Sequence, residues 1–473
     1  MNRKFQYSHL KVFAMEKIRS IKTLSAPALL LAFFMSVSIS CKKDSLADIA
    51  PKTSATVQVT TPTQTTTPTN QVSYHVSPQG NDNNNGSLEH PFATITKAWT
   101  VVEPGNIILV HGGTYVINAI NGDAYIKLIN KSGASNKYIT ISNYAGEKPV
   151  FDASSCSATN YRAIISISNC NYLYIKGIRF TGLKQANTGQ GGNYGFVGTA
   201  VSNCKFEQIE ADHIGGYPFF LTGNCINDTI LNCDAHHGSD PFSPVAYGGS
   251  NGFSVDVVPI TSKGIVFIGC RAWMNSDDGF EGYKNDGYIS FVNCWSFWNG
   301  YVPEEGIPSA FVKAGDGDGF KLGNSTGAYD ATIHRTCQNC LSIENKLFGF
   351  DQNGLNQAFE VINCTSYANL LGPIHTQSNG YVNIFRNNLS YGESGQTIGA
   401  AATNDHNSWN LSISLTASDF LSLDKSQLVS PRNADGSLPS ITLLHLSGSS
   451  QCQNKGVNVG LPYSGIAPNL GCF

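Results

Sequence analysis

The sequence of 473 residues carries little charge of either sign. Asp, Glu, Lys and Arg together make up 13% of it, and the formal net charge is −3. Binding of nucleic acid needs a concentrated basic surface, so we expect no nucleic-acid partner. An acidic ligand would need a bound cation to offset its charge.

Helical patterning is also scarce. Outside the N-terminus no long segment repeats its apolar residues with the 3.6-residue period of a helix. Glycine is abundant instead, with 47 residues, and Asn, Ser and Thr are frequent. This composition favours a solenoid, which can hold most of the chain in one domain.

The N-terminus has the features of an export signal. Basic residues precede an apolar run over residues 26–39 that is too short to be a convincing membrane span. The run ends at Ser38-Ile39-Ser40-Cys41, which resembles a bacterial lipobox, although Ser38 stands where Leu is usual. We therefore predict a lipoprotein signal peptide over residues 1–40, with plain secretion as the alternative.

Acylated Cys41 would then be the mature N-terminus and the sole contact with the membrane. The Thr/Pro-rich segment that follows has few apolar side chains to bury, so residues 41–71 are predicted to be an extended tether. These features indicate an outer-membrane lipoprotein facing either the cell surface or the periplasm.

An internal repeat dominates the rest of the chain. It reads Asn-Cys, small polar, aromatic, Asn, and its copies are NCDAHHG at Asn232, GCRAWMN at Gly269, NCWSFWN at Asn293, NCLSIEN at Asn339, NCTSYAN at Asn363 and NNLSYGE at Asn387. Four of its cysteines, at 270, 294, 340 and 364, are spaced by 24, 46 and 24 residues. The middle step is either two turns or one turn with a long loop.

A period in the low twenties, with short β-branched and aromatic runs, predicts three short strands per coil. The fold class is thus all-β, a parallel β-helix formed by residues 72–473 as a single, monomeric domain. Equivalent residues stack in columns at the strand spacing of about 4.8 Å. Within these columns we expect buried, mostly unpaired cysteines and a ladder of asparagine amides. Pairing of Cys452 with Cys472 is left open.

A second register carries chemistry. Four segments share a Gly-aromatic core, and they are NGFS at Asn251, DGFE at Asp278, DGFK at Asp318 and FGFD at Phe348. In register, they place Ser254, Glu281, Lys321 and Asp351 in one outward-facing column. A lysine among carboxylates on a rigid surface fits a site for a hard cation such as calcium, which takes six to eight oxygen ligands. The plainer interpretation is a set of solvated loop charges paired with Lys321.

These motifs resemble a known family. NSDDGFE at Asn275, GDGFKLGN at Gly317 and GFDQN at Gly349 are similar to segments of the family-nine polysaccharide lyases. Those enzymes are calcium-dependent pectate-type lyases on a right-handed parallel β-helix. The resemblance covers nearly all of residues 72–473, and its three central motifs are its most specific part.

The resemblance implies roles for particular residues. Lys321 takes the position of the catalytic lysine, and Asp277, Asp278 and Glu281 take those of Ca²⁺ ligands. Asn251 stands where the family has a further Asp, and Glu281 stands where Asp is more usual. Whether Asn251 weakens or abolishes calcium binding is open, and Asp256 is a candidate to compensate for it.

The implied reaction is β-elimination in an acidic plant polysaccharide, pectin. Lys321 would remove the C5 proton of a galacturonate unit, Ca²⁺ would stabilise the charge that develops on the C6 carboxylate, and the C4 oxygen would leave. Candidate substrate-binding residues are His237, Arg271, Lys284, Arg335 and Asp351. Trp273, Trp295, Trp298 and Tyr301 are expected to pack within the coils.

Two other functions compete with this one. A glycoside hydrolase on the same fold would use paired Asp277 and Asp278, but the Gly-His-Gly and Arg-Ile-Lys segments of such hydrolases are missing. A non-catalytic glycan-binding solenoid would not need Lys321. Among lyases, the sequence does not choose between homogalacturonan and rhamnogalacturonan I, nor between endo and exo cleavage.

Overall fold

A computed structural model describes residues 71–473 except 160, 188, 190, 257–262, 326 and 378–379. The predicted signal peptide, Cys41 and nearly all of the predicted tether lie outside these residues. In the part of the chain that is described, no helix is long and apolar enough to cross a membrane.

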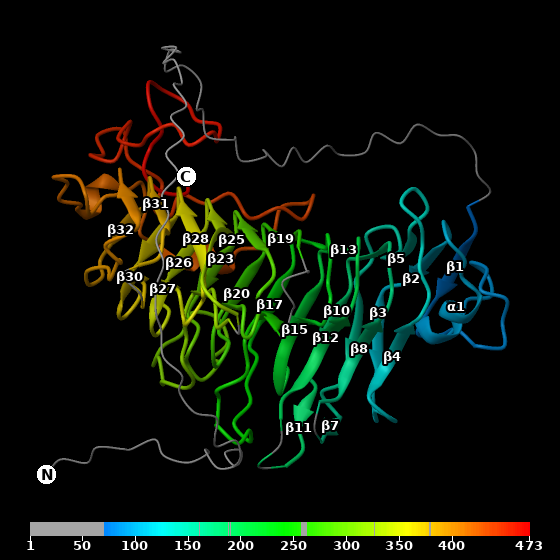
Figure 1. The fold of residues 1–473 in the computed structure, drawn as a ribbon. Coiled ribbons are helices and arrows are strands. Elements are labelled where there is room, and N and C mark those ends of the chain that lie inside the picture. The colour runs from blue at the N-terminus through cyan, green and yellow to red at the C-terminus, as the bar shows by residue number, and fades with distance from the viewer. Residues whose placement is uncertain are drawn as a thin grey trace, which may run out of the picture. The chain divides into compact units, whose positions relative to one another are not determined.

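The described residues wind into a right-handed parallel β-helix (Figure 1) with three long sheets. The 12-stranded sheet contains, in spatial order, β1 (Ser73–Val76), β2 (Ile107–Val110), β5 (Ile139–Asn143), β9 (Leu173–Lys176), β13 (Lys205–Glu207), β16 (Thr229–Leu231), β19 (Ile265–Ile268), β22 (Ile289–Val292), β25 (Asp330–Gln338), β28 (Gln357–Ile362), β31 (Ile384–Arg386) and β33 (Thr403–Asp405).

The other two long sheets complete each coil. The 10-stranded sheet contains β3 (Gly113–Val116), β6 (Pro149–Asp152), β10 (Arg179–Thr181), β14 (Glu210–Asp212), β17 (Asp234–His236), β20 (Arg271–Trp273), β23 (Trp295–Phe297), β26 (Leu341–Ile343), β29 (Thr365–Tyr367) and β32 (Leu389–Tyr391). The 9-stranded sheet contains β4 (Ala124–Ile129), β8 (Ala163–Ser168), β12 (Asn193–Thr199), β15 (Gly216–Thr222), β18 (Phe253–Asp256), β21 (Phe280–Glu281), β24 (Phe320–Lys321), β27 (Phe348–Asp351) and β30 (Gly372–His375).

The remaining elements are short. β7 (Ser157–Ala158) pairs with β11 (Lys184–Gln185), and the 3-10 helices are η1 (Ala417–Asp419) and η2 (Lys425–Val429). Helix α1 (Ile95–Val101) follows β1, and its N-cap Thr94 accepts a hydrogen bond from the Lys97 amide. Ile95, Ala98 and Trp99 of α1 join the main core, so this helix covers apolar side chains of the first coils.

The predicted register is confirmed. Asp234 pairs with Arg271, Arg271 with Trp295, and Trp295 with Leu341, so the repeats lie one above another. The 46-residue step is therefore one turn with a long loop. The amide ladder is also present, because Asn275, Asn299, Asn345 and Asn369 bond in series through Nδ2 to Oδ1 distances of 3.0, 2.9 and 2.9 Å.

The cysteines of the described residues are all free thiols, and all but Cys472 are buried. Cys452 and Cys472, whose pairing was open, are among them. The tryptophans also pack as expected. Trp273, Trp295 and Trp298 are buried in a second core between the 10-stranded sheet and the segment after β33.

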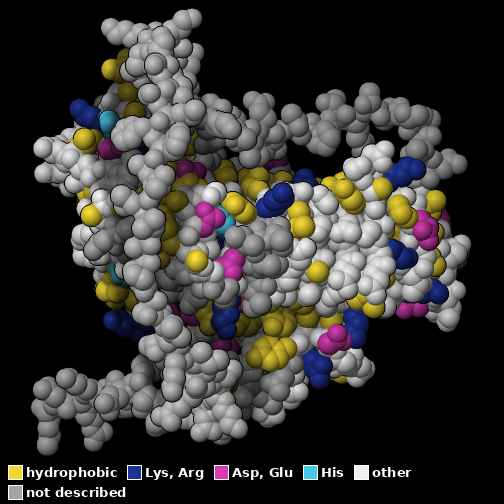
Figure 2. Space-filling model, viewed as in Figure 1, with side chains coloured by type: hydrophobic (Ala, Val, Ile, Leu, Met, Phe, Trp, Pro, Cys, Tyr) yellow, Lys and Arg dark blue, Asp and Glu magenta, His cyan; other side chains and the backbone are white. Residues whose placement is uncertain are grey.

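Charge on the surface is dispersed. On the face drawn in Figure 2, basic and acidic side chains are scattered among uncharged ones and do not gather into one basic patch. This face thus agrees with the near-neutral composition.

Candidate active site

Four glycines on successive coils, Gly252, Gly279, Gly319 and Gly349, place the candidate site by allowing close packing between coils. A Cβ atom at Gly279 would lie 2.0 Å from Ser296 Oγ and 2.7 Å from Gly319 O. At Gly319 it would lie 2.3 Å from Ser342 Oγ and 2.6 Å from Gly349 O. None of the four is at positive φ, so the requirement for glycine is the absence of a side chain and not an unusual turn.

The phenylalanines that follow these glycines anchor the next column. Phe253, Phe280, Phe320 and Phe350 stack in the interior with centroid separations of 5.1, 4.8 and 4.9 Å. The adjacent residues then align outward, because Ser254 pairs with Glu281, Glu281 with Lys321, and Lys321 with Asp351. The predicted column of Ser254, Glu281, Lys321 and Asp351 is thereby confirmed.

The Lys321 amine lies among carboxylates from the preceding coil. Its Nζ is 2.8 Å from Asp278 Oδ2 and 3.3 Å from Glu281 Oε1. Asp278 is fully buried, and its Oδ1 accepts hydrogen bonds from the amides of Gly317 and Asp318 at 3.0 and 2.6 Å. Asp278 thus fixes both the amine and the turn that leads into β24.

Burial and mutual repulsion raise the pKa of Asp277, Asp278 and Glu281. Burial raises the pKa of Glu281 to about 7, with Lys321 opposing the shift and Asp278 adding to it. Burial likewise raises the pKa of Asp277 and Asp278. Burial would lower the pKa of Lys321, but the charges of Asp278, Glu281 and Asp277 outweigh it and hold that pKa well above its usual value.

The cluster has more acidic groups than one ammonium can balance. Asp256 is nearly inaccessible, its Oδ1 has no hydrogen-bond partner, and burial followed by the charge of Glu281 raises its pKa. Asn251 is buried as well; its Nδ2 donates to Glu281 Oε2 and its Oδ1 accepts from the Asp278 amide at 2.9 Å. This set of buried oxygens fits a hard divalent cation such as Ca²⁺.

Asp316 is a member of the cluster that the sequence analysis did not identify. Its Oδ2 lies 3.4 Å from Lys321 Nζ, and its amide donates to Asp277 Oδ1 at 2.6 Å. It lies near the end of the long loop between β23 and β24 and is largely exposed. The signal was the sequence GDGDGF, in which Asp316 precedes Asp318 by two residues.

Two candidate substrate-binding residues lie on the coils next to Lys321. Asp351 is in register with Lys321 on the next coil, and its Oδ1 lies 2.6 Å from His375 Nδ1. Lys284 is exposed three residues after Glu281, with its amine 5.1 Å from the centroid of the Tyr283 ring. Both remain predictions.

The structure does not bring the two arginines to this cluster. Arg335 is fully buried, and its guanidinium donates to the carbonyls of Leu322, Gly287 and Asn285. Arg271, on the 10-stranded sheet, forms an ion pair with Asp234 at 2.8 Å and donates to the Leu428 and Ser430 carbonyls. Both bind the protein itself, since a buried guanidinium needs such partners.

His237 is also engaged inside the protein. It is 7% exposed, its Nε2 lies 2.9 Å from the Glu304 carbonyl oxygen, and its Nδ1 lies 2.7 Å from His236 Nδ1. Burial, followed by the charge of His236, lowers the pKa of His237 to about 4. The predicted sugar contact is thus blocked by neighbouring groups in this conformation.

Comparisons with known proteins agree with this architecture. Residues 74–388 match the family model described as "Pel9A-like, right handed beta helix region". The chain is 34% identical over 409 residues to pectate lyase L of Dickeya dadantii, covering 85% of this chain and 90% of the relative.

Solved structures show the same similarity. The crystal structure of pectate lyase Pel9A superposes with a TM-score of 0.70 at 31% identity, covering 85% of this chain and 96% of that one. A rhamnogalacturonan lyase superposes with a TM-score of 0.71 at 28% identity, covering 80% of this chain and 97% of that one.

Proposed function

The chain belongs to the Pel9A-like family of right-handed β-helix polysaccharide lyases, and from this premise we propose that it cleaves the galacturonate-containing backbone of pectin by calcium-dependent β-elimination. One observation carries the proposal, namely the amine of Lys321 held at 2.8 Å from Asp278 within a buried cluster of side-chain oxygens. The proposed enzyme is exported and anchored to the outer membrane through acylated Cys41.

Lys321 is the proposed base, acting at Nζ on the C5 proton of the sugar. Its position is fixed from both sides, because β24 pairs with β21 and β27 and the lysine side chain is only 9% exposed. The fixed backbone positions the amine before substrate binds, and such positioning removes part of the entropic barrier. The released proton stays on Nζ until solvent removes it.

Asn251, Asp277, Asp278 and Glu281 are the proposed Ca²⁺ ligands, with Asp256 and Asp316 close enough in the fold to add oxygens. When bound there, Ca²⁺ supplies positive charge that balances the carboxylates and attracts the substrate carboxylate. The residues of the chain then have separate tasks, since the acids would hold the cation and the lysine would move the proton. Neutralised carboxylates no longer hold the pKa of Lys321 high, which favours the basic amine.

The test is an absorbance assay for the unsaturated uronide product on purified homogalacturonan and purified rhamnogalacturonan I. We expect product from at least one polymer, loss of product on adding a calcium chelator, and recovery on adding back Ca²⁺ but not Mg²⁺. The preferred polymer identifies the substrate. Chain cleavage without ultraviolet absorbance would indicate hydrolysis and contradict the proposal, and so would full activity in chelator.

A further inference from the structure

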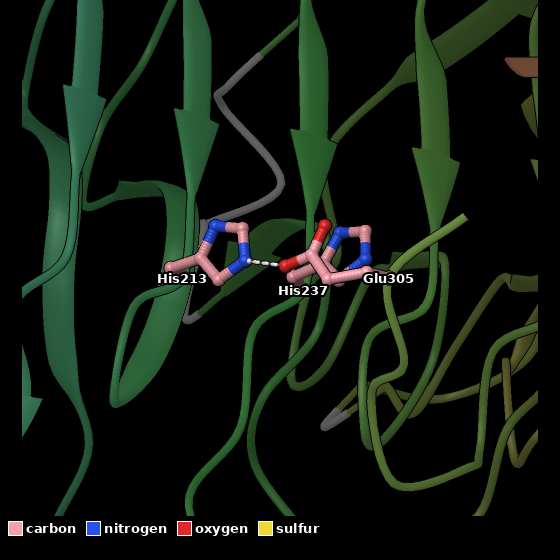
Figure 3. Close-up of side chains that lie close together, drawn as sticks. All are labelled: His213, His237 and Glu305. Atoms are coloured by element: carbon pink, nitrogen blue, oxygen red, sulfur yellow. Dashed lines mark hydrogen bonds and ion pairs between the residues drawn. The ribbon is translucent and has the colours of Figure 1, made fainter.

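A second cluster of ionisable groups lies apart from Lys321, where the 10-stranded sheet turns toward the 9-stranded sheet. Figure 3 shows His213 and His237 with the carboxylate of Glu305 close to both rings. The two rings stack with centroids 4.9 Å apart, and a nitrogen or oxygen from each of the three side chains lies within 4.8 Å of the others. His213 and His237 directly follow β14 and β17 on successive coils, whereas Glu305 comes from the long loop between β23 and β24.

The outer nitrogen of each ring faces the loop. Nε2 of His213 is 2.7 Å from Glu305 Oε1, and Nε2 of His237 is 2.9 Å from the Glu304 carbonyl oxygen. The loop thus places a carboxylate next to one imidazole nitrogen and a carbonyl group next to the other.

The inner nitrogen of each ring faces a group in the solenoid that is able to accept a hydrogen bond. Nδ1 of His213 is 2.5 Å from Oδ1 of the fully buried Asp212. Nδ1 of His237 is 2.7 Å from His236 Nδ1, and Nε2 of His236 is in turn 3.5 Å from Glu210 Oε1. A histidine that ligates a metal usually donates its other N–H to a carboxylate or similar acceptor, which fixes the tautomer.

We propose that Nε2 of His213, Nε2 of His237 and the carboxylate of Glu305 bind a divalent transition metal of the zinc type. Both rings would then carry their proton on Nδ1, where Asp212 and the His236–Glu210 pair already stand as acceptors. Imidazole nitrogens suit Zn²⁺ and its neighbours, whereas Ca²⁺ takes oxygen ligands, so this site differs in kind from the cluster at Lys321. A fourth position is left for water or the Glu304 carbonyl.

A neighbouring group, Glu210 with Asp212 and His236, also has metal-binding residue types. Both of its carboxylates already have an arginine as partner, because Arg179 donates to Asp212 at 2.7 and 2.8 Å and lies 3.2 Å from Glu210. In contrast, no Lys or Arg forms an ion pair with Glu305 among the described residues, and its side chain is 81% exposed. Among these described acids, Glu305 is therefore the one that can bind a cation from solvent without first displacing a lysine or an arginine.

The metal would tie the long loop to the solenoid. The loop that carries Glu305 leads to Asp316, which lies against Lys321, and the Gly315 amide donates to the Ser276 carbonyl at 2.7 Å. A metal at Glu305 would hold one part of this loop while Ser276 and Asp277 hold its end. The site would thereby fix one wall beside the catalytic coils, and it does not depend on the reaction proposed there.

The experiment titrates the full chain with Zn²⁺ against a chromophoric zinc chelator in excess Ca²⁺, and with Co²⁺ to record visible absorption. We expect one Zn²⁺ per chain with a Kd on the order of 1 µM or tighter, and the intense Co²⁺ bands of a four-coordinate site. His213→Gln and Glu305→Gln should each weaken Zn²⁺ binding about tenfold or more.

Glu304→Gln is the matched control, because the Glu304 side chain caps Ser309 at 2.9 Å and only its carbonyl faces His237. It should bind Zn²⁺ like the parent chain. Glu305→Gln only replaces an exposed carboxylate by a neutral amide, so a folding defect will not mask its effect; circular dichroism checks this. Absence of stoichiometric Zn²⁺, or the same affinity in His213→Gln and Glu305→Gln as in the parent, would overturn the proposal.

Discussion

Two clusters of charged side chains lie near the turns that link the 10-stranded and 9-stranded sheets, and they differ in almost every property. The cluster at Lys321 consists of one amine and side-chain oxygens, all buried except Asp316. The cluster at His213 contains imidazole rings and an exposed carboxylate. The first is built mainly from residues on successive coils, whereas the second needs a loop residue 92 positions away from His213.

This difference shows that the solenoid meets two structural requirements with different parts of the chain, a fixed distance between side chains and access for a partner. Residues that must keep a fixed distance stand on neighbouring strands, where the backbone sets their spacing. Residues that must admit and release a partner include one from a loop, which can move. The following predictions test whether the two clusters are independent, beginning with the largest effect.

Lys321→Ala should abolish lyase activity while leaving Zn²⁺ binding unchanged. Loss of a general base lowers the rate by about 10²–10⁴-fold, and uronide absorbance under saturating Ca²⁺ measures it. Lys127→Ala, which alters a half-exposed lysine on β4, is the control and should keep full activity. Lyase activity within tenfold of the parent in Lys321→Ala would show that another group removes the proton.

Asn251→Asp should affect Ca²⁺ binding but not Zn²⁺ binding, because it adds one negative charge to the cluster at Lys321 alone. Calcium affinity increases with ligand charge, so the Ca²⁺ midpoint of activity should fall about tenfold. Without Ca²⁺ the new carboxylate would face Glu281, so the Tm of the metal-free protein should fall by a few degrees, about 2 °C or more.

A calcium titration and a thermal melt of the same samples measure both effects. Asn203→Asp, on a turn remote from the glycine column, should change neither of them. An unchanged Ca²⁺ midpoint in Asn251→Asp would place the cation elsewhere, and Zn²⁺ affinity should be the same in both variants.

The smallest expected effect is a pH dependence of the loop that carries Glu305. The hydrogen bond to Asp212 raises the pKa of His213, burial opposes the shift, and Glu305 adds to it. While Glu305 is ionised, the attraction between His213 and Glu305 is thus complete below about pH 6.5 and is lost as the pH rises through the raised value. In chelator, trypsin cleavage after the exposed Lys313 should increase about twofold over this range.

The same measurement on His213→Gln should give a cleavage rate that does not respond to pH beyond the change in trypsin itself, which a model peptide records. A parent protein whose loop is cleaved equally at pH 6 and pH 9 would show that this ion pair does not restrain the loop.

The columns of stacked residues could be predicted from the sequence because every coil repeats the same packing contacts. A glycine followed by phenylalanine recurs where coils touch, so aligning Phe280 with Phe320 also aligned Glu281 with Lys321. The asparagine and cysteine columns followed from the same periodicity. Handedness and catalytic roles came from the resemblance to the lyase family and not from the repeat.

Charged residues on strands were harder to place. Arg271 and Arg335 had the charge to bind an acidic sugar, but both are buried by parts of the chain that no repeat predicts. The segment after β33 covers Arg271, and the carbonyls around Gly287 enclose Arg335. Glu305 and Asp316 were missed because loop length does not reveal where a loop folds back.

The close approach of the glycines has an evolutionary consequence. The spacing between successive coils sets the separation between the Lys321 amine and its acidic neighbours. Substitutions in the surrounding side chains therefore leave this separation unchanged. Loops of any length can be exchanged at the rim while the reaction geometry is inherited unchanged. A scaffold of this kind can acquire new substrates through changes in its loops, whereas a side chain at Gly279 or Gly319 would push apart the coils that carry the proposed catalytic residues.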